Sequence, residues 1–163
     1  MRYFTYDELT HSDLADKLQI DNTPDELTKM NIKSLVESVL DPLRTLYGRP
    51  INVKSGYRCR TLNRLVGDPT PFDVQHVIGD AADLVVAEGI EGLHYLAELA
   101  ISYCLPFGRL CIEGDHLHIT HRFGHPQERA CYVMSDGEYE RVSVEQFWVC
   151  TLGRDLPVIY WNV

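Results

Sequence analysis

Apolar residues recur at the spacing of an amphipathic helix over long stretches of this 163-residue chain. In the first stretch, Thr23 is the expected N-cap, Pro24 the first helical position and Gly48 the end of the helix. Because proline lacks the backbone N–H, Asp41-Pro42 is expected to kink or divide this helix. Further helices are predicted over residues 12–18, 60–66 and 90–103.

Alternation of apolar and polar residues predicts several short strands. They are expected over residues 51–54, 82–87, 109–113 and 116–120. Gly114-Asp115 suits a tight hairpin turn between the last two. A further hairpin is predicted over residues 131–144, turning at Asp136-Gly137, followed by strand-like pieces at 147–151 and 158–161. Helices come first and antiparallel strands follow, so the fold class is α+β, with N-terminal helices packed on a small antiparallel sheet in one domain, 1–163.

Composition and charge exclude some classes of function. A net charge of −9 argues against a nucleic-acid partner, which requires a basic face. No window approaches the roughly 20 apolar residues of a membrane span. The start of the chain has no apolar signal region, so we expect synthesis in the cytoplasm. The five Cys are odd in number and form no C-x-x-C pair, which favours reduced thiols. We expect a monomer.

The most informative stretch joins His76 to Asp83 through a glycine turn at Gly79. The small Ala81 and Ala82 let the backbone pass close by. Asp83 opens an otherwise apolar strand, where a carboxylate must be paired or coordinating, because burying a bare charge is costly. Taken alone, the pair is equally consistent with a surface histidine and a strand-end acid.

His118 changes this balance, because it lies in an alternating strand where His116 shares its face. In a hairpin turning at residues 114–115, Glu113 faces His116 and Cys111 faces His118. Glu113 and both histidines then gather on one side. Two imidazoles and a carboxylate are the ligand set of a catalytic zinc site with one open position.

Four motifs together resemble the zinc D-Ala-D-Ala carboxypeptidases and L-alanyl-D-glutamate endopeptidases, whose fold is shared with the hedgehog signalling domain. They are Ser55-Gly56-Tyr57-Arg58, Asn63-Arg64-Leu65-Val66-Gly67, Gln75-His76-Val77-Ile78-Gly79-Asp80-Ala81-Ala82-Asp83 and Asp115-His116-Leu117-His118. The opening segment also looks like the phage and prophage branch: Phe4-Thr5, Glu8-Leu9, Asn22-Thr23-Pro24 and Leu40-Asp41-Pro42-Leu43-Arg44. The resemblance covers about residues 3–120 and leaves 121–163 as a strand-rich C-terminal extension.

The resemblance implies a hedgehog/DD-peptidase-like fold and a bound Zn²⁺. By the same resemblance, the zinc ligands are His76, Asp83 and His118. Asp115 then matches the family's catalytic acid, and Arg58 its substrate-binding and polarising arginine. The chain departs from the pattern around the substrate pocket, with Val74 in place of Ser, Asp68 in place of Gly and His116 in place of Trp.

This reading predicts a zinc-dependent peptidase that cleaves peptidoglycan stem peptides with a metal-activated water. Asp115 is the preferred base, because it lies at the family's acid position three residues before the last ligand, and Glu113 is the alternative, because it lies on the ligand face of the hairpin. His116 either hydrogen-bonds the tetrahedral intermediate or packs against the hairpin. The enzyme would reach the cell wall through lysis or within a virion. The alternatives are a non-catalytic zinc-binding structural or partner-binding protein of phage origin, and a hydrolase of another amide or ester bond.

Overall fold

The computed structural model describes residues 1–66, 73–135 and 138–152. Its helical elements are α1 (Tyr6–Thr10), α2 (Asp13–Leu18), α3 (Glu26–Leu35), the π-helix η1 (Val36–Leu40), α4 (Asp41–Tyr47), α5 (Arg60–Val66), α6 (Asp73–Val77), α7 (Gly89–Ser102) and α8 (Val144–Leu152). The strands are β1 (Asn52–Ser55), β2 (Ala81–Val85), β3 (Arg109–Glu113), β4 (His116–Thr120), β5 (Ala130–Ser135) and β6 (Glu138–Val142).

The strands form one sheet in the order β1-β2-β4-β3-β5-β6. Neighbouring strands run antiparallel except β3 and β5, which are parallel. The predicted α+β class is confirmed, whereas the expectation of a purely antiparallel sheet is wrong at this one pairing. A long connection runs from the end of β4 to the start of β5, which lies on the other side of β3. A connection of this kind permits a parallel pairing, whereas a tight hairpin does not.

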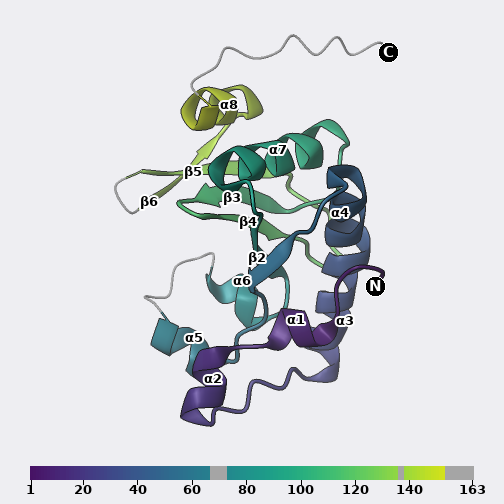
Figure 1. Ribbon diagram of the computed structural model, residues 1–163, viewed down its shortest axis with the longest axis vertical. Helices are drawn as coiled ribbons and strands as arrows, with labels where there is room; N and C mark the ends of the chain where they lie inside the picture. The colour runs from purple at the N-terminus through teal and green to yellow at the C-terminus, as the bar shows by residue number, and fades with distance from the viewer. Residues whose placement is uncertain (67–72, 136–137, 153–163) are drawn as a thin grey trace.

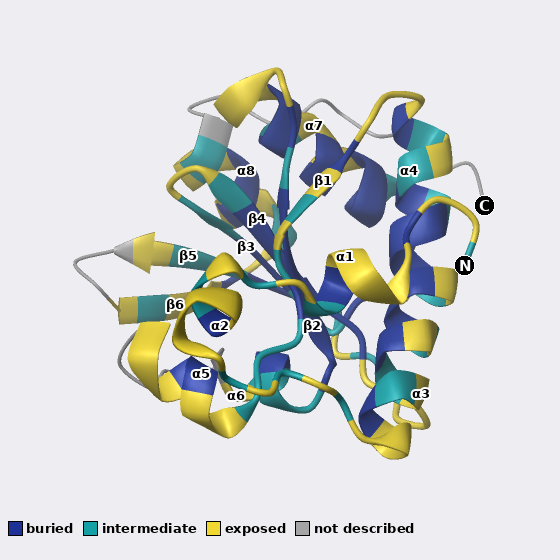
Figure 2. Cartoon of the chain, turned by 60° about the horizontal axis from the view of Figure 1, so that its bottom comes forward, coloured by how far each residue is buried: buried dark blue, intermediate teal, exposed yellow. Residues whose placement is uncertain are grey.

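One face of the sheet forms the core. Helix α7 packs on this face, while α1, α2, α5 and α6 lie toward the other (Figure 1). Buried residues concentrate on β2, β4 and α7 (Figure 2). Leu84 lies opposite Leu117, and Ile119 opposite Leu110, and all four are fully buried. Each such side chain contributes roughly 1.5–3 kcal/mol by leaving water, so this face fixes the register that positions the residues of the opposite face.

The first long helix begins two residues later than predicted. Asp25, not Thr23, is the N-cap of α3, and its carboxylate accepts the backbone N–H of Thr28 at 2.8 Å. The predicted division at Asp41-Pro42 is present as the π-helical turn η1, which is followed directly by α4. A widened turn before Pro42 accommodates the ring and the missing N–H.

Two short helices on the site side were not predicted as helices. Helix α1 begins with a capping box in which Thr5 and Glu8 each bond the other's backbone N–H. The predicted loop over residues 67–73 ends at Asp73, which is the first residue of helix α6, and residues 67–72 lie outside the described part of the chain. Helix α6 matters most for function, because it carries His76.

The C-terminal extension is less strand-rich than predicted. Residues 147–151, expected to form a strand, belong to helix α8, in which Phe147 and Trp148 are buried against the core. The signal for this helix is Ser143 followed three residues later by Gln146, since each side chain bonds the other's backbone N–H. The piece expected at 158–161 lies outside the described residues, and the hairpin of β5 and β6 forms as predicted.

None of the helices in the described part of the chain has the length and apolar character to cross a membrane. All five Cys lie in described segments and none of them forms a disulfide, as the sequence predicted. Cys111 and Cys131 are buried, and burial raises the pKa of both thiols, so they act as small apolar residues.

Candidate active site

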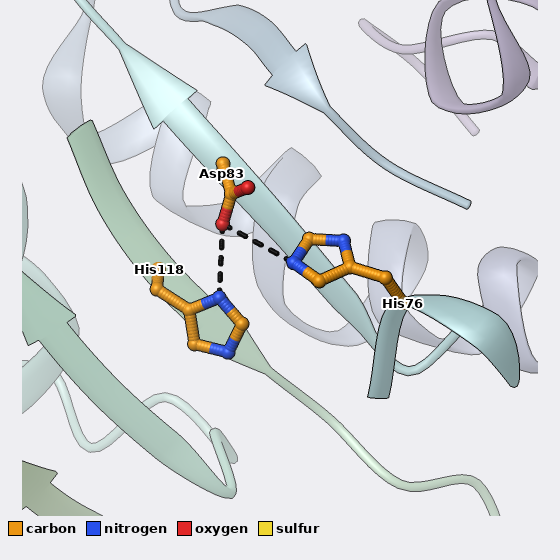
Figure 3. Close-up of side chains that lie close together, drawn as sticks. All are labelled: His76, Asp83 and His118. Atoms are coloured by element: carbon orange, nitrogen blue, oxygen red, sulfur yellow. Dashed lines mark hydrogen bonds and ion pairs between the residues drawn. The ribbon is translucent and has the colours of Figure 1, made fainter. Parts of the chain in front are cut away.

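Three side chains from three elements meet on the open face of the sheet. Asp83 on β2 lies directly opposite His118 on the neighbouring strand β4, and His76 reaches them from α6 (Figure 3). Asp83 Oδ1 lies 2.9 Å from His118 Nδ1 and 3.3 Å from His76 Nε2. All three residues are buried. The structure therefore brings together the predicted zinc ligands, which lie up to 42 residues apart in the sequence.

The orientation of His76 is fixed by the backbone of residue 56. The ring Nδ1–H donates to the carbonyl oxygen of Gly56 at 2.7 Å, which turns Nε2 toward Asp83. Such an outer hydrogen bond selects the tautomer that a metal-binding histidine needs. Gly79, with φ of +78°, turns the chain from α6 into β2 so that His76 and Asp83 face each other.

Electrostatics hold Asp83 ionised. Burial disfavours its charged form, but the imidazoles of His76 and His118 outweigh burial and keep the pKa of Asp83 well below its usual range. An ionised carboxylate whose oxygen lies close to two ring nitrogens is a strong anionic ligand for a metal ion. The ligand atoms of this trio all lie within 4.8 Å of one another, which one metal ion can span.

The trio fits a catalytic zinc better than a structural one. Zinc takes imidazole and carboxylate ligands readily, and sites with three protein ligands keep a position open for water or substrate. In the described segments, no other group of three histidine, cysteine or carboxylate donors is close enough to hold a metal. The two buried cysteines, Cys111 and Cys131, do not belong to the trio.

Beside the trio lies a second pair on the same face. Glu113 on β3 pairs with His116 on β4, as predicted, and Glu113 Oε2 lies 3.5 Å from His116 Nε2. The other oxygen, Glu113 Oε1, is buried and accepts no hydrogen bond within the described residues. Burial alone would lower the pKa of His116, but Glu113, Asp83 and Asp115 together raise it. Glu113 thus lies on the same face as the trio, and its Oε1 can accept a further hydrogen bond.

Asp115 has a different setting. Its side chain is 74% exposed in the turn between β3 and β4, and Lys54 Nζ lies 2.6 Å from its Oδ1. The bond from Lys54 is the main reason that the pKa of Asp115 falls to about 2. The same oxygen lies 3.1 Å from Nδ1 of His116, whose Nε2 points to Glu113 and Asp83. The His116 ring therefore lies between Asp115 and the Asp83 carboxylate of the trio.

The trio, Glu113, His116 and Lys54 line a cavity of about 880 Å³. Arg58 lines it too, while its backbone N–H donates to the carbonyl of His76. Sequence reasoning missed Tyr139 on β6, which reaches the same cavity from the C-terminal extension. The predicted hairpin placed Tyr139 on a strand, but the parallel pairing of β3 with β5 was needed to bring that strand beside the site. Asp7 and Asp13 from the two short N-terminal helices also line the cavity.

The comparison with protein families agrees with this geometry. The family model described as peptidase M15 matches residues 2–120, and the chain belongs to that family of metallopeptidases. The resemblance to zinc D-Ala-D-Ala carboxypeptidases is thereby confirmed, while the phage branch stays a prediction. A search of curated proteins found no match. The matched region ends with β4, so β5, β6 and α8 follow it.

Zinc is expected to stabilise the folded protein through this trio. With free zinc at 100 times its dissociation constant, binding adds about 2.7 kcal/mol to the free energy of unfolding. The Asp83→Asn variant should lose this gain, because an amide is a poor zinc ligand. Denaturant unfolding with and without zinc measures it. The Asp115→Asn variant is the control and should keep the gain; an equal gain in the Asp83→Asn variant would exclude Asp83 as a ligand.

A methyl group at residue 56 is expected to disturb the site from behind. A Cβ on Gly56 would lie 2.3 Å from the backbone oxygen of Leu9, so α1 or the Gly56 carbonyl that orients His76 must move. The Gly56→Ala variant should lose about 1–3 kcal/mol of stability and bind zinc more weakly. Gly48→Ala, where nothing lies within 4 Å, should lose stability only through its left-handed backbone and keep its zinc affinity. Unchanged zinc affinity in Gly56→Ala would refute this link.

Proposed function

We propose that this peptidase M15 member is a zinc-dependent peptidase of peptidoglycan stem peptides. The observation that carries the proposal is the buried trio of His76, Asp83 and His118, which lines a cavity of about 880 Å³. Beside it lies a carboxylate oxygen of Glu113 that has no hydrogen-bond partner among the described residues. A site that only binds zinc for stability has no use for a half-buried acid beside it. We infer that His76, Asp83 and His118 would hold the ion.

A zinc ion in such a site lowers the pKa of water and polarises a carbonyl group. The protein's own groups would then perform the proton transfers. We propose Glu113 as the base, because it lines the cavity beside the trio and its Oε1 accepts no hydrogen bond from the residues that the structure describes. The sequence favours Asp115 as the base, because it lies three residues before the last proposed ligand. In the structure, however, the Asp115 carboxylate pairs with Lys54 in the solvent-exposed turn. We therefore propose that Asp115 orients His116.

His116 and Arg58 are proposed to bind the substrate. The Nδ1 of His116 faces Asp115, which leaves Nε2 directed into the site. Against the effect of burial, the surrounding carboxylates raise the pKa of His116, and the doubly protonated ring can donate from Nε2 to the oxygen of the scissile group. Arg58 lines the cavity and is well suited to clamp a carboxylate or to stabilise a developing oxyanion through its planar fork. A substrate that ends in a carboxylate would use the first role, and an internal peptide bond the second.

Digestion of purified peptidoglycan by the zinc-loaded protein, followed by mass spectrometry, tests the activity. Loss of the terminal D-Ala identifies a carboxypeptidase, and release of stem-peptide fragments identifies an endopeptidase. The Asp83→Asn variant should leave the material intact. If the wild-type protein also leaves it intact while zinc is bound, the chain is a non-catalytic zinc-binding relative and the proposal fails.

Two matched variants separate the candidate bases. Glu113→Gln is expected to lower kcat by about 10²–10⁴-fold, the usual contribution of a general base, with zinc content unchanged. Asp115→Asn should have a smaller effect and leave the acidic limb of the pH–rate profile in place, because the pKa of Asp115 is about 2 and the group stays ionised above that pH. The opposite result, with Glu113→Gln near wild type and Asp115→Asn inactive, would assign the base to Asp115.

A further inference from the structure

A second cavity of about 670 Å³ lies on the other side of the segment that precedes α5. Its lining comes from the segment before α3 and from α3 itself, from the start of α5, from the end of α6 and the turn after it, and from residues 122–125. Tyr57 lines this cavity and also the cavity of the metal trio. The two cavities are therefore neighbours, although the second contains none of the residues assigned to catalysis.

Asp80 is the unusual residue of this second cavity. It is 2% exposed, and its Oδ1 is buried and accepts no hydrogen bond from any described residue. Burial raises the pKa of Asp80 to about 6, and the charge of Arg122 offsets this rise only in part. A buried carboxylate without a donor is costly. Because native proteins pair nearly all buried polar groups, such an oxygen indicates that a donor outside the described residues completes it.

The charges around Asp80 indicate what that donor carries. Asp21 and Asp25 add two carboxylates to the lining, and Arg60 and Arg122 add two guanidinium groups. A metal ion fits poorly, because in the described residues three candidate donor atoms come within 4.8 Å of one another only at His76, Asp83 and His118. A ligand that carries one positive and one negative charge close together matches a lining of both signs.

We propose that the second cavity binds the zwitterionic head group of an α-amino acid. The ammonium group would donate to Asp80, and the carboxylate would pair with Arg122. Such a group has two sources: a free amino acid, or the end of a diamino-acid side chain on a peptide held in the first cavity. The second source rests on the proposed peptidase function, whereas binding of a free amino acid does not.

Calorimetric titration of the full chain with three forms of one amino acid tests the proposal. The probes are D-alanine, N-acetyl-D-alanine and D-alaninamide, which present both charges, the negative charge alone and the positive charge alone. The wild-type protein should bind D-alanine with a dissociation constant in roughly the millimolar range, and each blocked form about tenfold more weakly. Equal affinity for all three forms, or no binding of D-alanine, would overturn the proposal.

Variants then locate the binding. Asp80→Asn should weaken D-alanine binding about tenfold, and Arg122→Gln should remove the preference for D-alanine over D-alaninamide. Glu98→Gln, which removes one exposed charge on α7 away from both cavities, is the control and should bind like wild type. Asp80→Asn removes an unpaired buried charge, so its melting temperature should equal or exceed that of wild type. Wild-type affinity in Asp80→Asn would mean that Asp80 takes no part in binding and would overturn the proposal.

Cleavage assays distinguish the two sources. For a stem peptide with a free diamino-acid end, Asp80→Asn should raise KM and leave kcat unchanged, whereas the same peptide with an acetylated amine should be cleaved equally by both proteins. If the wild-type protein has the same KM for the free and for the acetylated peptide and still binds D-alanine, the cavity is assigned to the free amino acid. If no peptide is cleaved by either protein, the peptidase proposal fails and the binding result stands alone.

Discussion

The pairing of Asp83 with His118 across β2 and β4 is the constraint on which the rest of the site depends. One face of these strands is closed by Leu84, Leu117 and Ile119, so a shift of register by one residue would expose that apolar set. The hydrophobic core therefore sets the distance between a carboxylate and an imidazole on the opposite face. Helix α6 then adds His76, whose ring is aimed by the carbonyl of Gly56. Site and core are two sides of one sheet.

Because one face of the sheet forms the core and the other forms the site, the site can bury an ionised acid beside its partners. The cost of burying Asp83 is offset by two imidazoles, and the half-buried Glu113 lies beside His116. Glu113 keeps one oxygen without a hydrogen bond within the described residues. Unsatisfied buried oxygens are rare where a protein needs only stability and are typical of sites that act on a ligand. Glu113 and Asp80 are both of this kind, in neighbouring cavities.

Much of this arrangement could be predicted from the sequence, because it depends on local signals. Alternation in residues 109–120 gave the hairpin and the pairing of Glu113 with His116, and the family resemblance indicated that His76, Asp83 and His118 form one site. The parallel pairing of β3 with β5 could not be predicted, since it depends on contacts between distant segments. For that reason the presence of Tyr139 in the cavity was missed. The opposite settings of Glu113 and Asp115 also depend on a distant residue, Lys54.

The most direct test of the account is X-ray absorption spectroscopy at the zinc edge of the zinc-loaded protein. A site made by His76, Asp83 and His118 with an open position predicts only nitrogen and oxygen neighbours, at about 2.0–2.2 Å, including two imidazole rings. A sulfur neighbour at about 2.3 Å, or a spectrum unchanged in the Asp83→Asn variant, would show that zinc binds elsewhere and would contradict the central claim.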